Sequence, residues 1–226
     1  MAAKNDEQKI KVSIDGPYIV TGGVPLIDLS MDTDAQGLST SWKEDKRYPV
    51  QDKYELCRCG QSKDKPFCDG THCEFLFDGE ETASREPVIT HAEPVTTGLE
   101  MDLIDIPVLC ASARFCDRAG GAWDNTRASD NPEAKKIAIQ EVTDCPAGRL
   151  LLRGKDGQFI EPKFEPSIGV VFDPIIHNIG PLWVRSGIPI ESTDGYTYEI
   201  RNRVTLCRCG KSTNKPFCDG KHCDTE

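Results

Sequence analysis

The sequence lacks any apolar run that approaches the roughly 20 residues of a membrane-spanning helix. It also lacks a net positive charge, because its 226 residues carry a formal net charge of −10 at pH 7. Nucleic-acid binders need a basic face for phosphate contacts, so this charge argues against a general nucleic-acid partner. The first residues, MAAKNDEQKIKVS, lack the apolar core of a signal peptide. We therefore expect a cytoplasmic protein with no membrane partner.

Signatures of the common enzyme classes are also missing. The sequence has no phosphate-binding glycine loop, no nucleophile elbow and no carboxylate pair that stands out from its general acidity. We expect that this chain alone turns over no substrate. In a reducing cytoplasm its eleven cysteines are expected to be metal ligands or free thiols rather than disulfides.

The sequence does contain a cysteine-rich segment that occurs twice. CRCGQSKDKPFCDGTHC occupies residues 57–73 (the first motif), and CRCGKSTNKPFCDGKHC occupies residues 207–223 (the second motif). Thirteen of the seventeen positions are identical. Both motifs have three cysteines and one histidine at the same offsets, which are Cys57, Cys59, Cys68 and His72, and then Cys207, Cys209, Cys218 and His222.

The spacing of these donors suits two metal atoms in each motif. Cys57 and Cys59 lie two residues apart and can point the same way in an extended loop. Cys68 and His72 lie four apart and share one face if Asp69 opens a helical turn. Thiolates select zinc, copper(I) or iron–sulfur clusters, and two donor pairs suit a two-iron cluster. Structural Cys3His zinc sites stay open as an alternative, although they usually have wider spacing between their first cysteines.

Both motifs resemble the CDGSH iron–sulfur family. Its pattern is Cys-X-Cys, two residues, Ser/Thr, three residues, then Pro-X-Cys-Asp-Gly-Ser/Ala/Thr-His. Lys221 departs from this pattern at the small-residue position and leaves the ligands intact. The resemblance implies two [2Fe–2S] clusters, one held by Cys57, Cys59, Cys68 and His72 and one by Cys207, Cys209, Cys218 and His222. Single-motif members form homodimers, so the resemblance implies a monomer whose two halves make a pseudo-two-fold internal pair.

The ligand set predicts the chemistry. Three thiolates and a neutral imidazole leave a cluster less negative than four thiolates do, so it accepts an electron more readily. The second imidazole nitrogen can exchange a proton as the cluster changes charge. We expect proton-coupled electron transfer, redox sensing or cluster transfer with an unidentified redox or cluster-acceptor protein. The alternatives are a zinc-stabilised interaction module and an accessory electron-transfer subunit of an oxidoreductase.

The repeat extends upstream of the motifs and predicts the fold. Residues 16–26 align without gaps to residues 180–190, and each stretch predicts a hairpin of two short strands around a tight turn. A further strand is expected directly before each motif. The first copy holds about fourteen extra residues, which we expect to form a polar loop around residues 32–46. The fold class is mainly β with short helices (small α+β), built from two CDGSH modules.

The segment between the modules contains three further cysteines. Residues 131–143 predict a helix with Asn131 as its cap, and residues 150–152 predict a strand that turns at Asp156. Cys110, Cys116 and Cys145 resemble a degenerate single-cluster ferredoxin segment, which would need four cysteines for [4Fe–4S]. They either hold a third cluster or are buried small hydrophobes. The predicted domains are 1–79, a linker and ferredoxin-like segment at 80–165, and 166–226.

Overall fold

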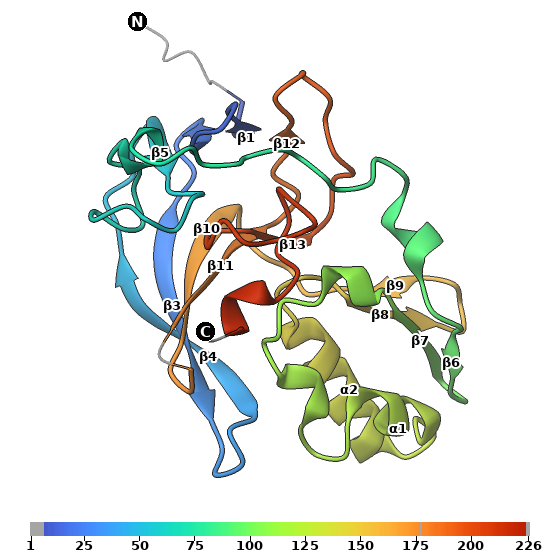
Figure 1. Cartoon of the computed structure of the whole chain (residues 1–226). Coiled ribbons are helices and arrows are strands. Elements are labelled where there is room, and N and C mark those ends of the chain that lie inside the picture. The colour runs from blue at the N-terminus through green and yellow to red at the C-terminus, as the bar shows by residue number, and fades with distance from the viewer. Residues whose placement is uncertain (1–6, 177, 225–226) are drawn as a thin grey trace, which may run out of the picture.

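A computed structural model of the chain describes residues 7–176 and 178–224. Most of its secondary structure is β, in three sheets (Figure 1). The strands of the two modules are β1 (Lys9–Val12), β2 (Tyr18–Thr21), β3 (Leu26–Thr33), β4 (Ser39–Arg47), β5 (Lys53–Leu56), β10 (Ser167–Asp173), β11 (Asn178–Arg185), β12 (Ile190–Glu191) and β13 (Arg203–Leu206). The segment between them contains β6 (Thr96–Thr97), β7 (Met101–Asp105), β8 (Leu150–Gly154), β9 (Phe159–Ile160), α1 (Ala122–Arg127) and α2 (Pro132–Asp144). Short 3-10 helices are η1 (Thr71–Cys73), η2 (Val88–His91), η3 (Pro107–Leu109), η4 (Phe115–Asp117) and η5 (Lys221–Cys223). The predicted fold class is confirmed.

The two modules repeat the same three-stranded unit. One sheet has the order β12-β1-β2-β5 and the second has β13-β11-β10-β3-β4. In the first unit β2 pairs antiparallel with β1 and β5, and in the second β11 pairs antiparallel with β10 and β13. The register also agrees, since Tyr18 lies opposite Leu56 and Leu182 lies opposite Leu206. The predicted pseudo-two-fold pairing is therefore visible in the sheets.

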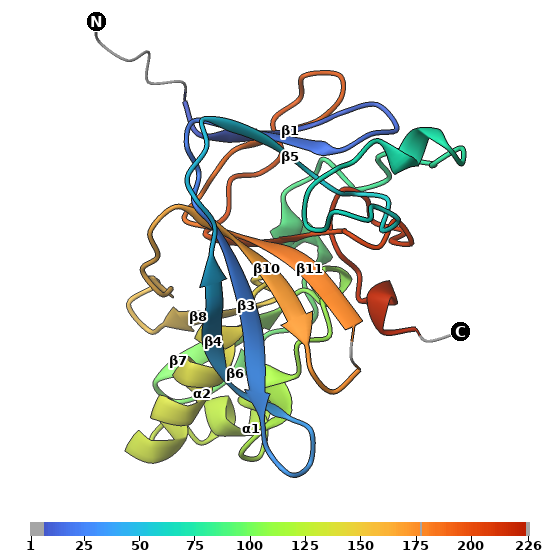
Figure 2. The same cartoon turned by 90° about the vertical axis from the view of Figure 1, so that its left-hand side faces the viewer.

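Each unit gives one strand to the other, which makes the predicted hairpins wrong. β3 leaves its own unit and pairs parallel with β10, whereas β12 pairs parallel with β1 (Figure 2). The turns themselves occur, at Gly22 and Gly23 and at Ser186 and Gly187, all with positive φ. The predicted hairpins cannot form because the first strand of each already pairs with another strand on both of its edges. β2 lies between β1 and β5, and β11 lies between β10 and β13.

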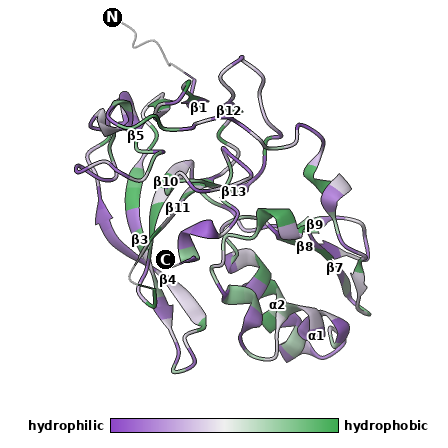
Figure 3. Ribbon diagram, viewed as in Figure 1, coloured by the Kyte–Doolittle hydropathy of each residue, from purple (hydrophilic) through white to green (hydrophobic). Residues whose placement is uncertain are grey.

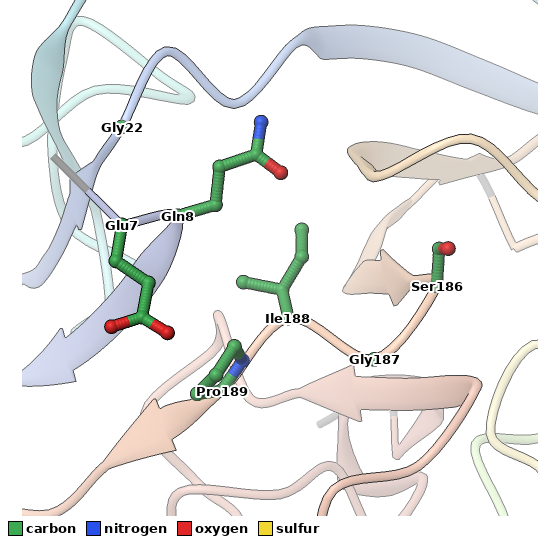
Figure 4. Close-up of a pocket in the computed structure, with 7 residues that line it drawn as sticks. All are labelled: Glu7, Gln8, Gly22, Ser186, Gly187, Ile188 and Pro189. Carbon is green, nitrogen blue, oxygen red and sulfur yellow. The ribbon is translucent and has the colours of Figure 1, made fainter. Parts of the chain in front are cut away.

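A cavity of about 540 Å³ lies between the residues that precede β1 and the two turns, at Gly22 and at Ser186 and Gly187. Figure 4 shows Gln8 and Glu7, just before β1, facing Ile188 and Pro189, which follow the second turn. The backbone N–H of Ile10 donates to the carbonyl of Pro189 beside it (2.9 Å). None of the described residues that line the cavity is a cysteine or histidine, so it is separate from the motifs.

The exchange gives both modules one hydrophobic core. Ile10 and Leu56 from the first module lie in the same apolar cluster as Ile168 and Leu206 from the second. Neither module could keep this core without the other, because each would expose apolar surface on the face it shares. The boundaries 1–79, 80–165 and 166–226 stay predictions.

The extra residues of the first copy are a strand pair rather than the predicted polar loop. β3 and β4 pair antiparallel with two register shifts, and the short turn between them is closed where Asp34 accepts the backbone N–H of Leu38 (2.9 Å). β4 lies at the sheet edge, so most of its side chains face solvent (Figure 3). Ser39 is buried, and Trp42 is half-buried because its ring packs against Phe115 and Trp183. A solvent-exposed edge strand has little apolar alternation to reveal it in sequence.

The intervening segment follows its prediction closely. α2 runs over Pro132–Asp144, and the Asn131 side chain accepts the backbone N–H of Glu133 (2.9 Å). β8 and β9 form the predicted turn around Asp156. No helix in residues 7–176 and 178–224 has the length and apolar character needed to cross a membrane.

Candidate iron–sulfur sites

The first motif follows directly from β5 and gathers its donors as two pairs. The sulfurs of Cys57 and Cys59 lie 3.7 Å apart. The sulfur of Cys68 lies 3.3 Å from Nδ1 of His72. Nε2 of the same imidazole lies near Gly16, because a Cβ placed on that glycine would be 3.5 Å from it. The ring therefore places Nδ1 beside the cysteine sulfur and turns Nε2 toward Gly16.

The second motif has nearly the same geometry. The sulfurs of Cys207 and Cys209 lie 3.7 Å apart, and the sulfur of Cys218 lies 3.4 Å from Nδ1 of His222. Within the described part of the chain, no three Cys, His, Asp or Glu side chains form a group that could hold one metal ion. The donors of each motif thus lie in two pairs, as the spacing predicts, and this arrangement fits two metal atoms.

Side chains within each motif hold the loop in shape. The Ser62 hydroxyl donates to the carbonyl of Phe67 (2.7 Å), and Asp69 accepts the backbone N–H groups of Lys63 (2.8 Å) and Thr71 (3.0 Å). These N–H groups hold the pKa of Asp69 well below its usual range. Ser212 and Asp219 make the same bonds in the second motif. The predicted helical turn exists, but it is a 3-10 turn whose first residue is Thr71.

The arginine between the two cysteines ties each motif to its upstream strand. Nε of Arg58 donates to the carbonyl of Gly16 (2.8 Å), and Nε of Arg208 donates to that of Gly180 (3.2 Å). Burial lowers the pKa of Arg208 to about 10. The conformation of each motif therefore depends on a residue far upstream in the sequence, Gly16 for the first motif and Gly180 for the second.

The motif thiols are crowded and mostly buried. The hydrogen bond from Cys207 lowers the pKa of Cys209 to about 6 and raises that of Cys207. Burial raises the pKa of Cys68 and that of Cys218. A buried thiolate is costly unless positive charge lies beside it, and metal ions supply that charge. This donor chemistry fits an iron–sulfur group in both motifs.

One contact between the modules could not be found by sequence reasoning. The hydroxyl of Tyr18, on β2 of the first module, donates toward the carbonyls of Cys207 (2.8 Å) and Pro216 (2.9 Å) in the second motif. Burial raises the pKa of Tyr18 well above its ordinary value, so the hydroxyl keeps its proton. Leu182 stands at the equivalent position of the second copy and has no such group.

The three remaining cysteines of interest share one site. Cys110, Cys116 and Cys145 line a pocket of about 220 Å³, the three-cysteine pocket. Nη1 of Arg149 lies 3.3 Å from the Cys110 sulfur, and the same guanidinium pairs with Asp105 (2.7 and 2.8 Å). Burial raises the pKa of Cys116 to about 12. Three soft donors on one pocket fit a cluster better than they fit scattered core residues.

Comparison with known proteins agrees with the repeat. Residues 15–73 and 179–223 both match the model of the family described as iron-binding zinc finger, CDGSH type. These two regions are of the CDGSH type, in the tandem form. Between its CDGSH regions, residues 96–155 match the model of a divergent 4Fe-4S mono-cluster family. No curated protein and no solved structure matches the chain.

The two CDGSH motifs differ in how deeply they are buried. Cys218 and His222 are only 3% and 6% exposed, whereas Cys68 and His72 are partly exposed. The intervening segment packs on the second CDGSH motif at Cys218, which lies in one buried cluster with Ile106 and Ala111. Figure 1 shows η5 (red) beside the loop of that segment (lime green), with the first motif (teal) on the far side. The near-identical sequences thus lie in different surroundings.

Proposed function

We propose that each CDGSH motif holds one [2Fe–2S] cluster through three cysteines and one histidine. The ligands are Cys57, Cys59, Cys68 and His72 in one motif and Cys207, Cys209, Cys218 and His222 in the other. The single observation that carries this proposal is the arrangement of donors in two close pairs per motif. Each iron of a two-iron cluster needs two protein ligands, and each pair supplies them.

The protein's role is to set the charge of each cluster and to provide a site where a proton can bind. When bound, such a cluster accepts and releases a single electron. His72 and His222 contribute neutral ligands and leave Nε2 able to hold a proton. The backbone N–H groups of Gln61 and Lys211 donate toward the sulfurs of Cys59 (3.4 Å) and Cys209 (3.5 Å), which favours the reduced state.

These properties support electron transfer, redox sensing or cluster delivery, without turnover of a substrate by this chain. The partner is a redox or cluster-acceptor protein with an acidic surface. Lys63 and Lys211 are exposed within the motifs and give an otherwise acidic chain local positive charge there. Arg58 and Arg208 are buried and take no part in docking.

Iron and sulfide quantitation, combined with visible absorption, tests the metal content. We expect a red-brown protein with at least four irons and matching acid-labile sulfide per chain, two irons for each [2Fe–2S] cluster. A colourless protein with about two zinc ions per chain would contradict the proposal and favour structural zinc sites.

A second group is proposed for the three-cysteine pocket. The observation that favours it is that Cys110, Cys116 and Cys145 line one pocket within the segment that matches a 4Fe-4S family. Three thiolates suit a [3Fe–4S] cluster, or a [4Fe–4S] cluster whose fourth iron takes an oxygen ligand. The Arg149–Asp105 pair places a positive charge beside Cys110, where it balances the added thiolate charge.

Cys116→Ala tests this third site. We expect the wild-type chain to contain about seven or eight irons, and the variant to lose three or four of them while the CDGSH absorption persists. Cys73→Ala is the matched control, since Cys73 is exposed and lies outside every proposed ligand set. Equal iron content in wild type and Cys116→Ala would mean that the pocket holds no cluster.

A further inference from the structure

The intervening segment touches the second CDGSH motif at a place where only glycine fits. A Cβ built on Gly220 would lie 2.6 Å from the Ser112 hydroxyl and 3.3 Å from the carbonyl of Cys110. Gly70, its counterpart in the first motif, has the same φ of 86° but nothing within 4 Å. The three-cysteine pocket therefore abuts the second motif through its own ligand Cys110, and this contact has no equivalent at the first motif.

Apolar packing joins the same two sites from a second side. Cys218, a ligand of the second motif, is buried in one cluster with Ile106 and Ala111, and Cys145 packs against that cluster. The side chain of Asn214 also donates to the carbonyl of Val108 (3.3 Å). Ligands of two separate sites thus share one continuous protein interior.

The two CDGSH motifs touch each other through a reciprocal glycine contact. A Cβ on Gly60 would lie 2.8 Å from the carbonyl of Cys209, and a Cβ on Gly210 would lie 2.8 Å from the carbonyl of Cys59. Cys59 therefore has Gly210 against its backbone, and Cys209 has Gly60. The second motif is therefore in contact with both other sites, at Gly210 with the first motif and at Gly220 with the intervening segment.

We propose that the three sites form a series in which the second CDGSH motif is the middle member. The inference rests on the proposed functions of both kinds of site. Gly220, Gly60 and Gly210 are positioning residues that hold neighbouring ligands in backbone contact. Because electron tunnelling weakens steeply with distance, an electron passes between the three-cysteine pocket and the first motif by way of the second. One electron moves at each step and no covalent bond forms or breaks. An external one-electron reductant supplies the electron, and any proton taken up at His72 or His222 on reduction comes from solvent.

The test is electron paramagnetic resonance of the dithionite-reduced full chain. His72→Cys alters the signal of the first centre and so assigns the two CDGSH signals. In wild type we expect faster spin relaxation at the second centre than at the first. The second centre has two paramagnetic neighbours, the first centre and the pocket cluster, whereas the first centre has only the second. Cys116→Ala should abolish this enhancement at the second centre and leave the first unchanged.

Gly220→Ala should weaken the same enhancement, whereas Gly70→Ala, which carries the same backbone strain without the contact, should not. Ser112→Gly added to Gly220→Ala removes the clashing hydroxyl and should restore the enhancement. If Gly220→Ala does not fold, the Cys116→Ala comparison alone decides the matter.

The outcomes distinguish a failure of the series from a failure of the proposed clusters. A third cluster that leaves the relaxation of the second centre unaffected, or equal effects of Gly220→Ala and Gly70→Ala, would overturn the series and leave the proposed clusters standing. Unchanged iron content and spectra in Cys116→Ala would remove the third cluster, and the series with it, without touching the two [2Fe–2S] sites.

Discussion

Mild acid is expected to release the iron of the first CDGSH motif before that of the second. Protonation of a coordinating imidazole nitrogen breaks its bond to iron, so proton access to His72 and His222 controls the loss. His72 is partly exposed, whereas His222 is 6% exposed. Burial also lowers the pKa of His222, so its protonated form is populated only at a lower pH than that of an exposed histidine.

The measurement is the decay of visible absorbance after a jump to a pH of about 5.5. We expect two phases of similar amplitude that differ at least about tenfold in rate, since ~1.4 kcal/mol of extra local opening energy suffices for that factor. His72→Cys should remove the fast phase, and His222→Cys the slow one. Cys73→Ser, next to His72 but outside the ligand set, should change neither. A single phase, or loss of the fast phase in His222→Cys, would refute the assignment.

Replacing His72 with cysteine is expected to lower the reduction potential of the first centre by on the order of 100 mV or more. A fourth thiolate adds a full negative charge beside a group that gains another on reduction. The substitution also removes the ring nitrogen that takes up a proton when the centre is reduced. In wild type, reduction favours protonation of the imidazole, so the potential rises as pH falls, by up to about 59 mV per pH unit.

The variant should therefore show a potential that hardly changes with pH. A spectroscopic redox titration at several pH values measures both effects. His222→Cys is the matched variant for the second centre and should leave the first potential close to its wild-type value. An unchanged potential with an unchanged pH slope in His72→Cys would show that His72 is not a ligand.

The sequence predicted most strongly those features that local chemistry determines. The pairs Cys57 with Cys59 and Cys68 with His72 follow from spacing along a short loop, and the structure brings each pair together. The helix over residues 132–144 follows from its cap at Asn131. These are short-range relations, in which few residues decide the outcome.

The strand exchange could not be predicted in the same way. Residues 16–26 have the turn and the two apolar runs of a hairpin, yet β3 pairs with β10 of the other module. Which edge a strand finds depends on which edges are already occupied, and that is a property of the whole sheet. β4 was missed because its side chains are mostly solvent-exposed at a sheet edge.

The sequence by itself determined the donors of both motifs, their spacing and the likeness of the two copies, because ligand chemistry depends on residue type and short loops. Only the tertiary structure decided that the copies are not equivalent. The intervening segment packs against Gly220 and not against Gly70, although both glycines have the same backbone conformation. Burial depends on which distant segment covers a residue, so two nearly identical motifs acquire different exposure and different neighbours.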